Sequence, residues 1–292
     1  MQPCHSTEKK RHSSRKFFLI HYSELNLPQI FKKNKKAMKK LIIKLSKPLF
    51  LLALIIGTGS LSAQESAVEI IRKMEDRMQG NSSIIEMTMT TVRPRYSREV
   101  SLKSWSKGDD YALILITAPA RDKGTAYLKR GNEIWNYVPN IDRMIKLPPS
   151  MMSQSWMGSD FSNDDLVRES SNISDYNHRI LRSERYEGRD CWVIELIPRP
   201  ESSIVFGKVI MWIAKDLYVQ MKIENYDEDD VLVSTLYFKN IKKMGGRTIP
   251  TRIEMIPHDR RGQKTILEYK AAQFDIPIED SFFSVQNLKN VR

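Results

Sequence analysis

Three carboxylates stand close together in the middle of the chain, at Asp160, Asp164 and Asp165. Neighbouring carboxyl groups push one another's pKa values apart, so such a group can supply a general acid and a general base. The alternative is that these acids cap helices and face solvent in a loop. A serine nucleophile would need a strained Gly-x-Ser-x-Gly turn, and Gly158-Ser159 lacks the second glycine. The pattern therefore predicts that the protein is not an enzyme.

Residues that bind metals or nucleotides are scattered. His178 and His258 are far apart among polar neighbours, without the spacing of a metal site. Cys4 lies in an N-terminal extension described below, so Cys191 has no partner for a disulfide and is expected to be a small buried side chain. Gly245-Gly246 does not form a phosphate-binding loop. We expect no metal ion and no cofactor.

The net charge of +12 suggests nucleic acid as a partner, but the excess charge is confined to one end of the chain. Residues 1–63 hold 13 of the 47 basic residues and two of the 35 acidic ones, which leaves 34 basic and 33 acidic residues in the remainder. Nucleic-acid binding requires clustered, uncompensated lysine and arginine. The alternation of charges after residue 63 therefore argues against a nucleic-acid partner.

The segment from Met38 to Ala63 has the three parts of a secretory signal peptide. Four lysines between residues 39 and 47 precede the apolar run 49–56, and small residues follow up to Ala63. The apolar run is much shorter than the ~20 residues of a membrane-spanning helix, although a membrane-anchored protein is the alternative. We expect cleavage after Ala63 and a periplasmic location. Because Gln64 follows this site in place of a cysteine, no lipid anchor is expected.

Residues 1–37 are polar and basic, and Met38 begins a complete signal peptide of its own. We therefore interpret residues 1–37 as a non-native or disordered extension and residues 38–63 as the signal peptide. Residues 64–292 contain no Gly/Ser/Pro linker and are expected to form one domain.

Hydrophobic periodicity predicts one helix followed by a sheet. Ser66-Ala-Val-Glu69 is a capping-box pattern, and apolar residues follow it at helical spacing as far as Met78. Apolar and polar residues then alternate in several segments, including residues 85–90, 217–224, 252–255 and 267–271, as in strands with one buried face. Short turn sequences separate these segments, which predicts an antiparallel meander of roughly ten strands.

An apolar sheet face must be covered by something, and helical material is scarce. Only the first helix and the Pro-rich segment Leu147–Ser171 are available as covers, which predicts a hydrophobic cavity under a helical or loop lid. Methionine suits such a site because its side chain adapts to flexible acyl chains. The candidate lipid-binding residues are Met87, Met89, Trp135, Tyr137, Met211, Met221 and Met255 in the cavity and Met151, Met152, Trp156, Met157 and Phe161 in the lid. The alternative is that these side chains only pack against one another in a closed barrel or sandwich.

Several segments resemble one protein family. Glu133-Ile-Trp-Asn-Tyr-Val-Pro139 followed by Arg143-Met-Ile-Lys146 resembles the hairpin of the outer-membrane lipoprotein-sorting family, the LolA-like carriers. The resemblance extends through residues 118–128, 157–166 and 246–255. It implies an unclosed β-barrel of about 10–11 strands with helices in its mouth, and transport of acylated lipoproteins or related lipids across the periplasm. The family uses an arginine near its cavity, for which Arg93, Arg95 and Arg98 are the candidates.

The resulting hypothesis is a monomeric periplasmic carrier that buries acyl chains and moves them toward the outer membrane. The resemblance is strongest to a branch found beside resistance-nodulation-division type exporters, which implies an inner-membrane transporter and an outer-membrane acceptor as partners. Two other hypotheses belong to different classes. One is a non-catalytic docking module for an envelope exporter, and the other is an enzyme acting on lipids, which would need a nucleophile and a base inside the cavity.

Overall fold

The computed structural model describes residues 65–131, 133–163, 165, 173–200, 202, 204 and 206–291. These residues belong to a compact unit that spans Gln64–Arg292. The predicted extension and signal peptide, as well as Asp164, lie outside the described residues. None of the helices in the described part of the chain is long and apolar enough to cross a membrane.

The predicted helix is present as α2 (Ala67–Met78). The Ser66 side chain accepts a hydrogen bond from the Glu69 amide, which caps the first turn as the sequence predicts. Ile70, Ile71 and Met74 are buried along one side of the helix, while Arg72 and Lys73 point away from that side. The helix is therefore held by its apolar stripe.

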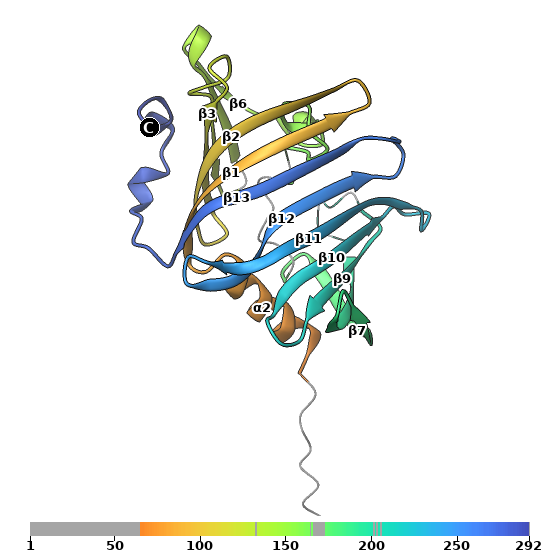
Figure 1. Ribbon diagram of the computed structural model, residues 1–292. Helices are drawn as coiled ribbons and strands as arrows, with labels where there is room; N and C mark the ends of the chain where they lie inside the picture. Colours follow the sequence, from red (N-terminus) through yellow and green to blue (C-terminus); the bar gives the residue numbers. More distant parts are fainter. Residues whose placement is uncertain are drawn as a thin grey trace, which may run out of the picture. The chain divides into compact units, whose positions relative to one another are not determined.

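Thirteen strands of the described residues form one antiparallel sheet in the order β6-β5-β4-β3-β2-β1-β13-β12-β11-β10-β9-β8-β7 (Figure 1). The first six are β1 (Ser82–Arg93), β2 (Tyr96–Lys107), β3 (Tyr111–Ala118), β4 (Ala126–Arg130), β5 (Glu133–Val138) and β6 (Arg143–Lys146). The others are β7 (Tyr176–Tyr186), β8 (Arg189–Pro198), β9 (Lys208–Ala214), β10 (Val219–Tyr226), β11 (Leu232–Met244), β12 (Arg247–Pro257) and β13 (Lys264–Phe274). The sheet begins at β6 and ends at β7, so the barrel is unclosed as expected.

The strand number exceeds the expected 10–11 because the chain between Tyr111 and Lys146 makes four short strands joined by tight turns. Chain order and sheet order nearly coincide, and the exception is β1, which pairs with both β2 and β13. This pairing brings Arg93 at the end of β1 close to the start of β13. Two distant parts of the sequence therefore meet at one end of the sheet, which we call the rim.

The sheet has an inner face, on which α2 packs, and an outer face. Along β1 the inner residues are Ile85, Met87 and Met89, and their partners Leu102 on β2 and Leu267 on β13 share that face. The predicted alternation fails in β10, where a bulge falls between Gln220 and Lys222. Because a bulge inserts one residue, it reverses which side chains face inward. Met221 therefore packs in a separate cluster with Cys191 and Trp212 instead of with Ile223.

Among the described residues, at least three segments cover the sheet. α2 packs on the β7–β10 part of the inner face, against Ile194, Leu196 and Met211. The lid, defined here as residues 151–163 with η3 (Trp156–Gly158), packs on the β1–β3 part of the same face. The third segment is the C-terminal one, with η4 (Asp280–Phe282) and η5 (Val285–Lys289), which packs Phe283 and Leu288 on the outer face of β2–β5.

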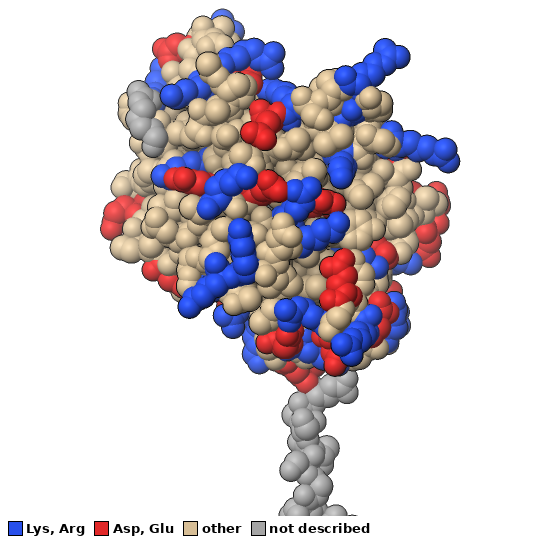
Figure 2. All heavy atoms as spheres, in the orientation of Figure 1, with Lys and Arg blue, Asp and Glu red and all other residues tan. Residues whose placement is uncertain are grey.

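The outer face of β11, β12 and β13 is covered by ion pairs instead of a chain segment. Lys270, Glu268, Arg252, Glu254 and Lys239 form a continuous row, with distances of 3.2 Å between Lys270 and Glu268 and 2.7 Å between Arg252 and Glu254. Figure 2 shows acidic and basic side chains alternating across this face. The alternation agrees with the near-neutral charge of the chain after residue 63.

Candidate functional site

The central part of the inner face is an apolar floor between α2 and the lid. Its buried members are Ile85, Phe238, Ile249, Ile253, Tyr269 and Ala272. Met87, Ile223, Leu236 and Leu267 pack against them and are only half-buried. Large apolar side chains that keep access to solvent inside a curved sheet are the residues that a hydrophobic ligand would cover.

The lid is anchored by Trp156. Its side chain is fully buried against Met89, Val100, Leu102 and Ile116. The ring of Tyr127 meets it edge to face, with ring centroids 5.6 Å apart. Burial beneath the lid raises the pKa of Tyr127. The lid turn also holds Met157 in a left-handed conformation with φ of 49°, which costs backbone energy and has to be held by neighbouring contacts.

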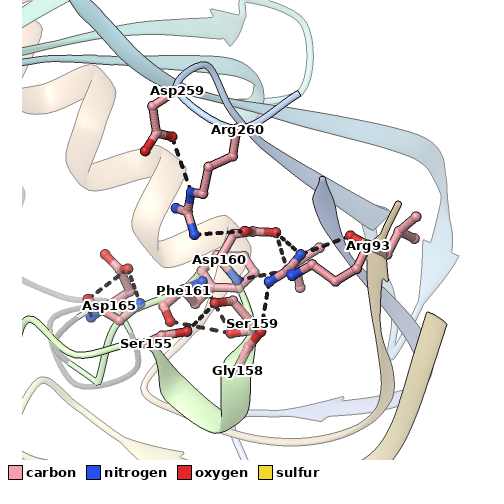
Figure 3. Close-up of polar contacts among 12 residues, drawn as sticks. Arg93, Ser155, Gly158, Ser159, Asp160, Phe161, Asp165, Asp259 and Arg260 are labelled. Carbon is pink, nitrogen blue, oxygen red and sulfur yellow. Dashed lines mark hydrogen bonds and ion pairs between the residues drawn. The ribbon is translucent and has the colours of Figure 1, made fainter. Parts of the chain in front are cut away.

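Two arginines of the inner face hold this turn. Arg98 on β2 donates to the Met157 carbonyl at 3.0 Å and pairs with Asp122 at 2.7 Å. Arg93 on β1 donates to the Gly158 carbonyl at 2.7 Å and to the Asp160 carboxylate at 3.0 Å (Figure 3). Of the three arginines that the sequence offered as candidates, Arg93 and Arg98 contact the lid, whereas Arg95 is exposed at the β1–β2 turn.

Asp160 is the one acidic residue of the lid, and its side chain is 0% exposed. The Thr265 hydroxyl donates to its Oδ2 at 2.7 Å and accepts from its backbone amide at 2.9 Å. Arg260 lies 3.6 Å from Oδ1, and Oδ1 has no hydrogen-bond partner among the described residues. Asp160 is therefore an ion-paired anchor of the lid, not a solvent-facing loop residue.

The other candidates for chemistry have structural roles in the described residues. Asp165 accepts hydrogen bonds from the amide and hydroxyl of Ser162, as expected of a capping residue. Ser159 is buried and exchanges hydrogen bonds with the Phe161 backbone. The His258 ring bonds to the Thr235 hydroxyl at 2.8 Å. Burial raises the pKa of the Cys191 thiol to about 11, in agreement with the predicted buried side chain.

The predicted cavity residues divide into two groups. Met87, Met89 and Met255 lie on the inner face near the floor, and Met211 lies beneath α2. In the lid, Trp156 and Phe161 are buried, and Met151, Met152 and Met157 are half-buried. The structure thus brings these nine residues to the inner face and its covers, and their contact with lipid remains a prediction.

Trp135, Tyr137 and Met221 lie elsewhere. Trp135 and Tyr137 pack on the outer face under the C-terminal segment, close to Phe283 and Leu288, and the Tyr137 hydroxyl donates to Asp142. Their expected place inside the cavity was wrong because the C-terminal segment forms an apolar cluster with them on the outer face. Met221 is displaced from the floor by the bulge in β10.

Arg260 and Thr265 are site residues that the sequence pattern did not indicate. Thr265 begins the inward-facing series of β13, two residues before Leu267, and this alternation could have placed it. Nothing in the local sequence pairs either residue with Asp160, which is 105 positions from Thr265.

A hollow of about 440 Å³ lies beside α2 and is lined by Lys73, Asp76, Arg77, Tyr218 and Arg247. Its polar groups are engaged already, because Lys73 pairs with Glu65 and Arg247 pairs with Asp275. This hollow is unsuited to an acyl chain. The described residues contain no cluster of His, Cys, Asp and Glu able to hold a metal ion.

The apolar floor and its two covers in an unclosed antiparallel sheet define a LolA-like fold, and solved structures agree. A DUF1329 family protein from Desulfovibrio piger is 24% identical with a TM-score of 0.69, covering 76% of this chain and 97% of its own. A domain assigned to outer membrane lipoprotein sorting from Vibrio parahaemolyticus is 26% identical with a TM-score of 0.68, covering 76% and 98%. A LolA superfamily protein from Nitrosomonas europaea is 26% identical with a TM-score of 0.65, covering 75% and 98%.

Residues 108–290 match a family model described as "-like: Uncharacterized protein", so the chain belongs to that family, and its structural neighbours are LolA superfamily and outer membrane lipoprotein-sorting domain proteins. No curated protein is significantly similar to it in sequence. The family resemblance of the sequence and the unclosed sheet are thus both confirmed.

Proposed function

We propose that this protein is a periplasmic carrier that binds the acyl chains of lipoproteins or other lipids on the inner face of its sheet. The observation that carries the proposal is the apolar floor, where Met87, Ile223, Leu236 and Leu267 stay half-buried between α2 and the lid. The names of the related proteins from Vibrio and Nitrosomonas support it, because they refer to lipoprotein sorting and to LolA.

The proposed mechanism is burial without bond cleavage. Each methylene group moved from water to the floor contributes ~0.8 kcal/mol, so a carrier needs no catalytic group to bind an acyl chain. The lid competes with the chain for the same apolar residues, and Leu267 contacts both the lid cluster and the floor cluster. Release then depends on the balance between a closed lid and a bound chain.

The cellular setting is part of the proposal. The signal peptide would be cleaved near Ala63, and residues 64–292 would act as a monomer between an inner-membrane transporter of the resistance-nodulation-division type and an outer-membrane acceptor. The segment 49–56 and the family resemblance support this setting.

The test is native mass spectrometry of the protein purified gently from the periplasm, followed by lipid extraction. We expect bound lipid or acyl-peptide on the wild type and a loss of most of it in Leu267→Asp, because a carboxylate on the floor has to be desolvated when a chain binds. Leu181→Asp, on the exposed edge strand β7, is the matched control and should retain the ligand.

A thermal unfolding scan separates loss of ligand from loss of fold in both variants. A wild-type protein without bound lipid, in a native fold, would contradict the carrier function. That result would favour the non-catalytic docking module, which needs no ligand on the inner face.

A further inference from the structure

We propose that Asp160 occupies a preformed anion site at the rim, and that the phosphate headgroup of an amphipathic cargo displaces it and thereby opens the lid. The proposal rests on the carrier function and narrows its cargo to lipids whose headgroup carries a phosphate. Four groups support it: the carboxylate itself, Arg93, Arg260 and Thr265 (Figure 3).

The site is built by the sheet, and the lid only fills it. Arg93 comes from the end of β1, Arg260 from the β12–β13 turn and Thr265 from the start of β13, and none of them is part of the lid. Figure 3 shows the two arginines approaching Asp160 from different sides. Two guanidinium groups and a hydroxyl that converge on an anion form the arrangement that binds phosphate.

The present occupant fits this site incompletely. One carboxylate oxygen, Oδ2, receives Arg93 and Thr265, whereas Oδ1 is buried without a hydrogen bond and Arg260 stays 3.6 Å away. An unsatisfied buried oxygen of a charged group is destabilising. A phosphate has more acceptor oxygens than a carboxylate and could receive both arginines at once.

The polarity of the inner face suits a ligand with a charged head and an apolar tail. Arg93, Arg98 and Thr265 lie toward the rim, and the inward-facing residues that follow Thr265 along β13 are Leu267 and Tyr269. At about 3.4 Å per residue, Leu267 is ~7 Å and Tyr269 is ~14 Å deeper than Thr265. A headgroup at the Asp160 position would therefore place its acyl chains on the floor.

Displacement of Asp160 would also release the lid. Arg93 holds the lid through both the Asp160 carboxylate and the Gly158 carbonyl, so a phosphate that engages Arg93 competes with both contacts. The lid turn would then keep one arginine contact, from Arg98 to the Met157 carbonyl, which has to break as the lid opens. In this way a single exchange, of the Asp160 carboxylate for the phosphate of the cargo, admits the cargo and opens the lid.

The experiment compares soluble lipids with the same tails. Dihexanoyl phosphatidic acid, dihexanoylglycerol and inorganic phosphate are titrated into the mature protein, and hydrogen exchange of residues 151–163 reports the lid. We expect phosphatidic acid to bind about tenfold more tightly than dihexanoylglycerol and to increase lid exchange, as one charge-assisted hydrogen-bond set is worth about that factor. If inorganic phosphate increased lid exchange as much as phosphatidic acid does, the site would be assigned to free phosphate. The proposal of a lipid headgroup would then be overturned.

Two variants isolate the site. Arg260→Gln should weaken phosphatidic acid about tenfold without changing dihexanoylglycerol, and Asp160→Asn should strengthen phosphatidic acid because the competing charge is gone. Arg261→Gln is the matched control, since it removes the same charge from the same turn and Arg261 has no ion pair among the described residues. Thermal unfolding verifies the fold of each variant.

The outcomes separate the two proposals. Equal binding of both lipids, unchanged by Arg260→Gln and Asp160→Asn, would overturn the phosphate site and leave the carrier function intact. Binding of neither lipid by folded wild-type protein would contradict the carrier function and the phosphate site together.

Discussion

α2 and the lid cover the same inner face, but they are held by different forces. α2 buries Ile70, Ile71 and Met74 almost completely, and Arg247 donates only to backbone carbonyls at its C-terminal end, those of Asp76 and Arg77. The lid buries Trp156 and is fixed by Arg93 and Arg98 through two backbone carbonyls and a buried carboxylate. Apolar contacts are lost only when the surfaces separate, whereas ion pairs can be exchanged for a competing anion. The difference suggests a permanent cover at one side and a removable one at the other.

Truncating a buried side chain of α2 should have the largest effect on global stability. Ile71→Ala removes a fully buried side chain, so we expect the free energy of unfolding to fall by ~3 kcal/mol in urea titrations. The matched control is Arg72→Ala on the exposed side, which should change it by less than ~0.5 kcal/mol. A loss below ~1 kcal/mol for Ile71→Ala would show that α2 is no more permanent than the lid.

Trp156→Ala should act locally instead. The side chain is buried under the lid, and its removal leaves a cavity against Met89 and Leu102. Because a small covering segment can open without the sheet, we expect hydrogen exchange of residues 151–163 to rise by about tenfold or more. The urea midpoint should shift less than in Ile71→Ala. Equal shifts in the two variants would mean that lid and sheet unfold together.

Arg98→Gln should loosen the lid less than Trp156→Ala does. It removes the hydrogen bond to the Met157 carbonyl and the ion pair with Asp122, contacts worth together ~1.5 kcal/mol at a partly exposed site. The readout is again hydrogen exchange of residues 151–163. Arg95→Gln is the control, since Arg95 has no ion pair among the described residues, and it should leave the exchange unchanged.

The pKa of Tyr127 offers a pH test of the lid. Burial raises it above the ordinary value of about 10, and this effect outweighs the direct contact with the Trp156 side chain, which lowers the pKa. A phenol whose pKa is raised in the closed state stabilises that state below about pH 10, and the contribution is lost as the pH rises through the raised value. Ultraviolet titration, with Tyr127→Phe as the blank, should show a lower pKa of Tyr127 in Trp156→Ala. An unchanged value would mean that the burial lost with Trp156 does not exceed its opposing contact with the phenol.

The smallest effect is expected outside both covers. Lys270→Ala removes the exposed end of the ion-pair row on the outer face, and exposed pairs contribute little, so the free energy of unfolding should change by less than ~0.5 kcal/mol. Neither urea titration nor lid exchange should distinguish it from the wild type. A change in the hydrogen exchange of residues 151–163 would show that the ion-pair row on the outer face is energetically coupled to the lid.

Much of the fold follows from local patterns. The capping box at Ser66, the apolar stripe as far as Met78 and the alternation along β1, β12 and β13 each depend on residues a few positions apart. The buried Cys191 was also predictable, because it lies beside Trp192 at the start of an apolar run. Trp135 and Tyr137 could not be assigned to a face, since the strand pattern does not reveal that the C-terminal segment covers the outer side.

By itself, the sequence determined the elements, the family and the apolar character of the inner face, because helical and strand periodicities and turn residues are local properties of the chain. Only the tertiary structure decided that Arg93, Arg260 and Thr265 meet at Asp160, which is 67 positions from Arg93 and 105 from Thr265. Such a meeting depends on the pairing of β1 with β13, on strand register and on where the lid lands. Strand pairing, register and lid position are set by contacts between residues far apart in the sequence, so no local pattern encodes them.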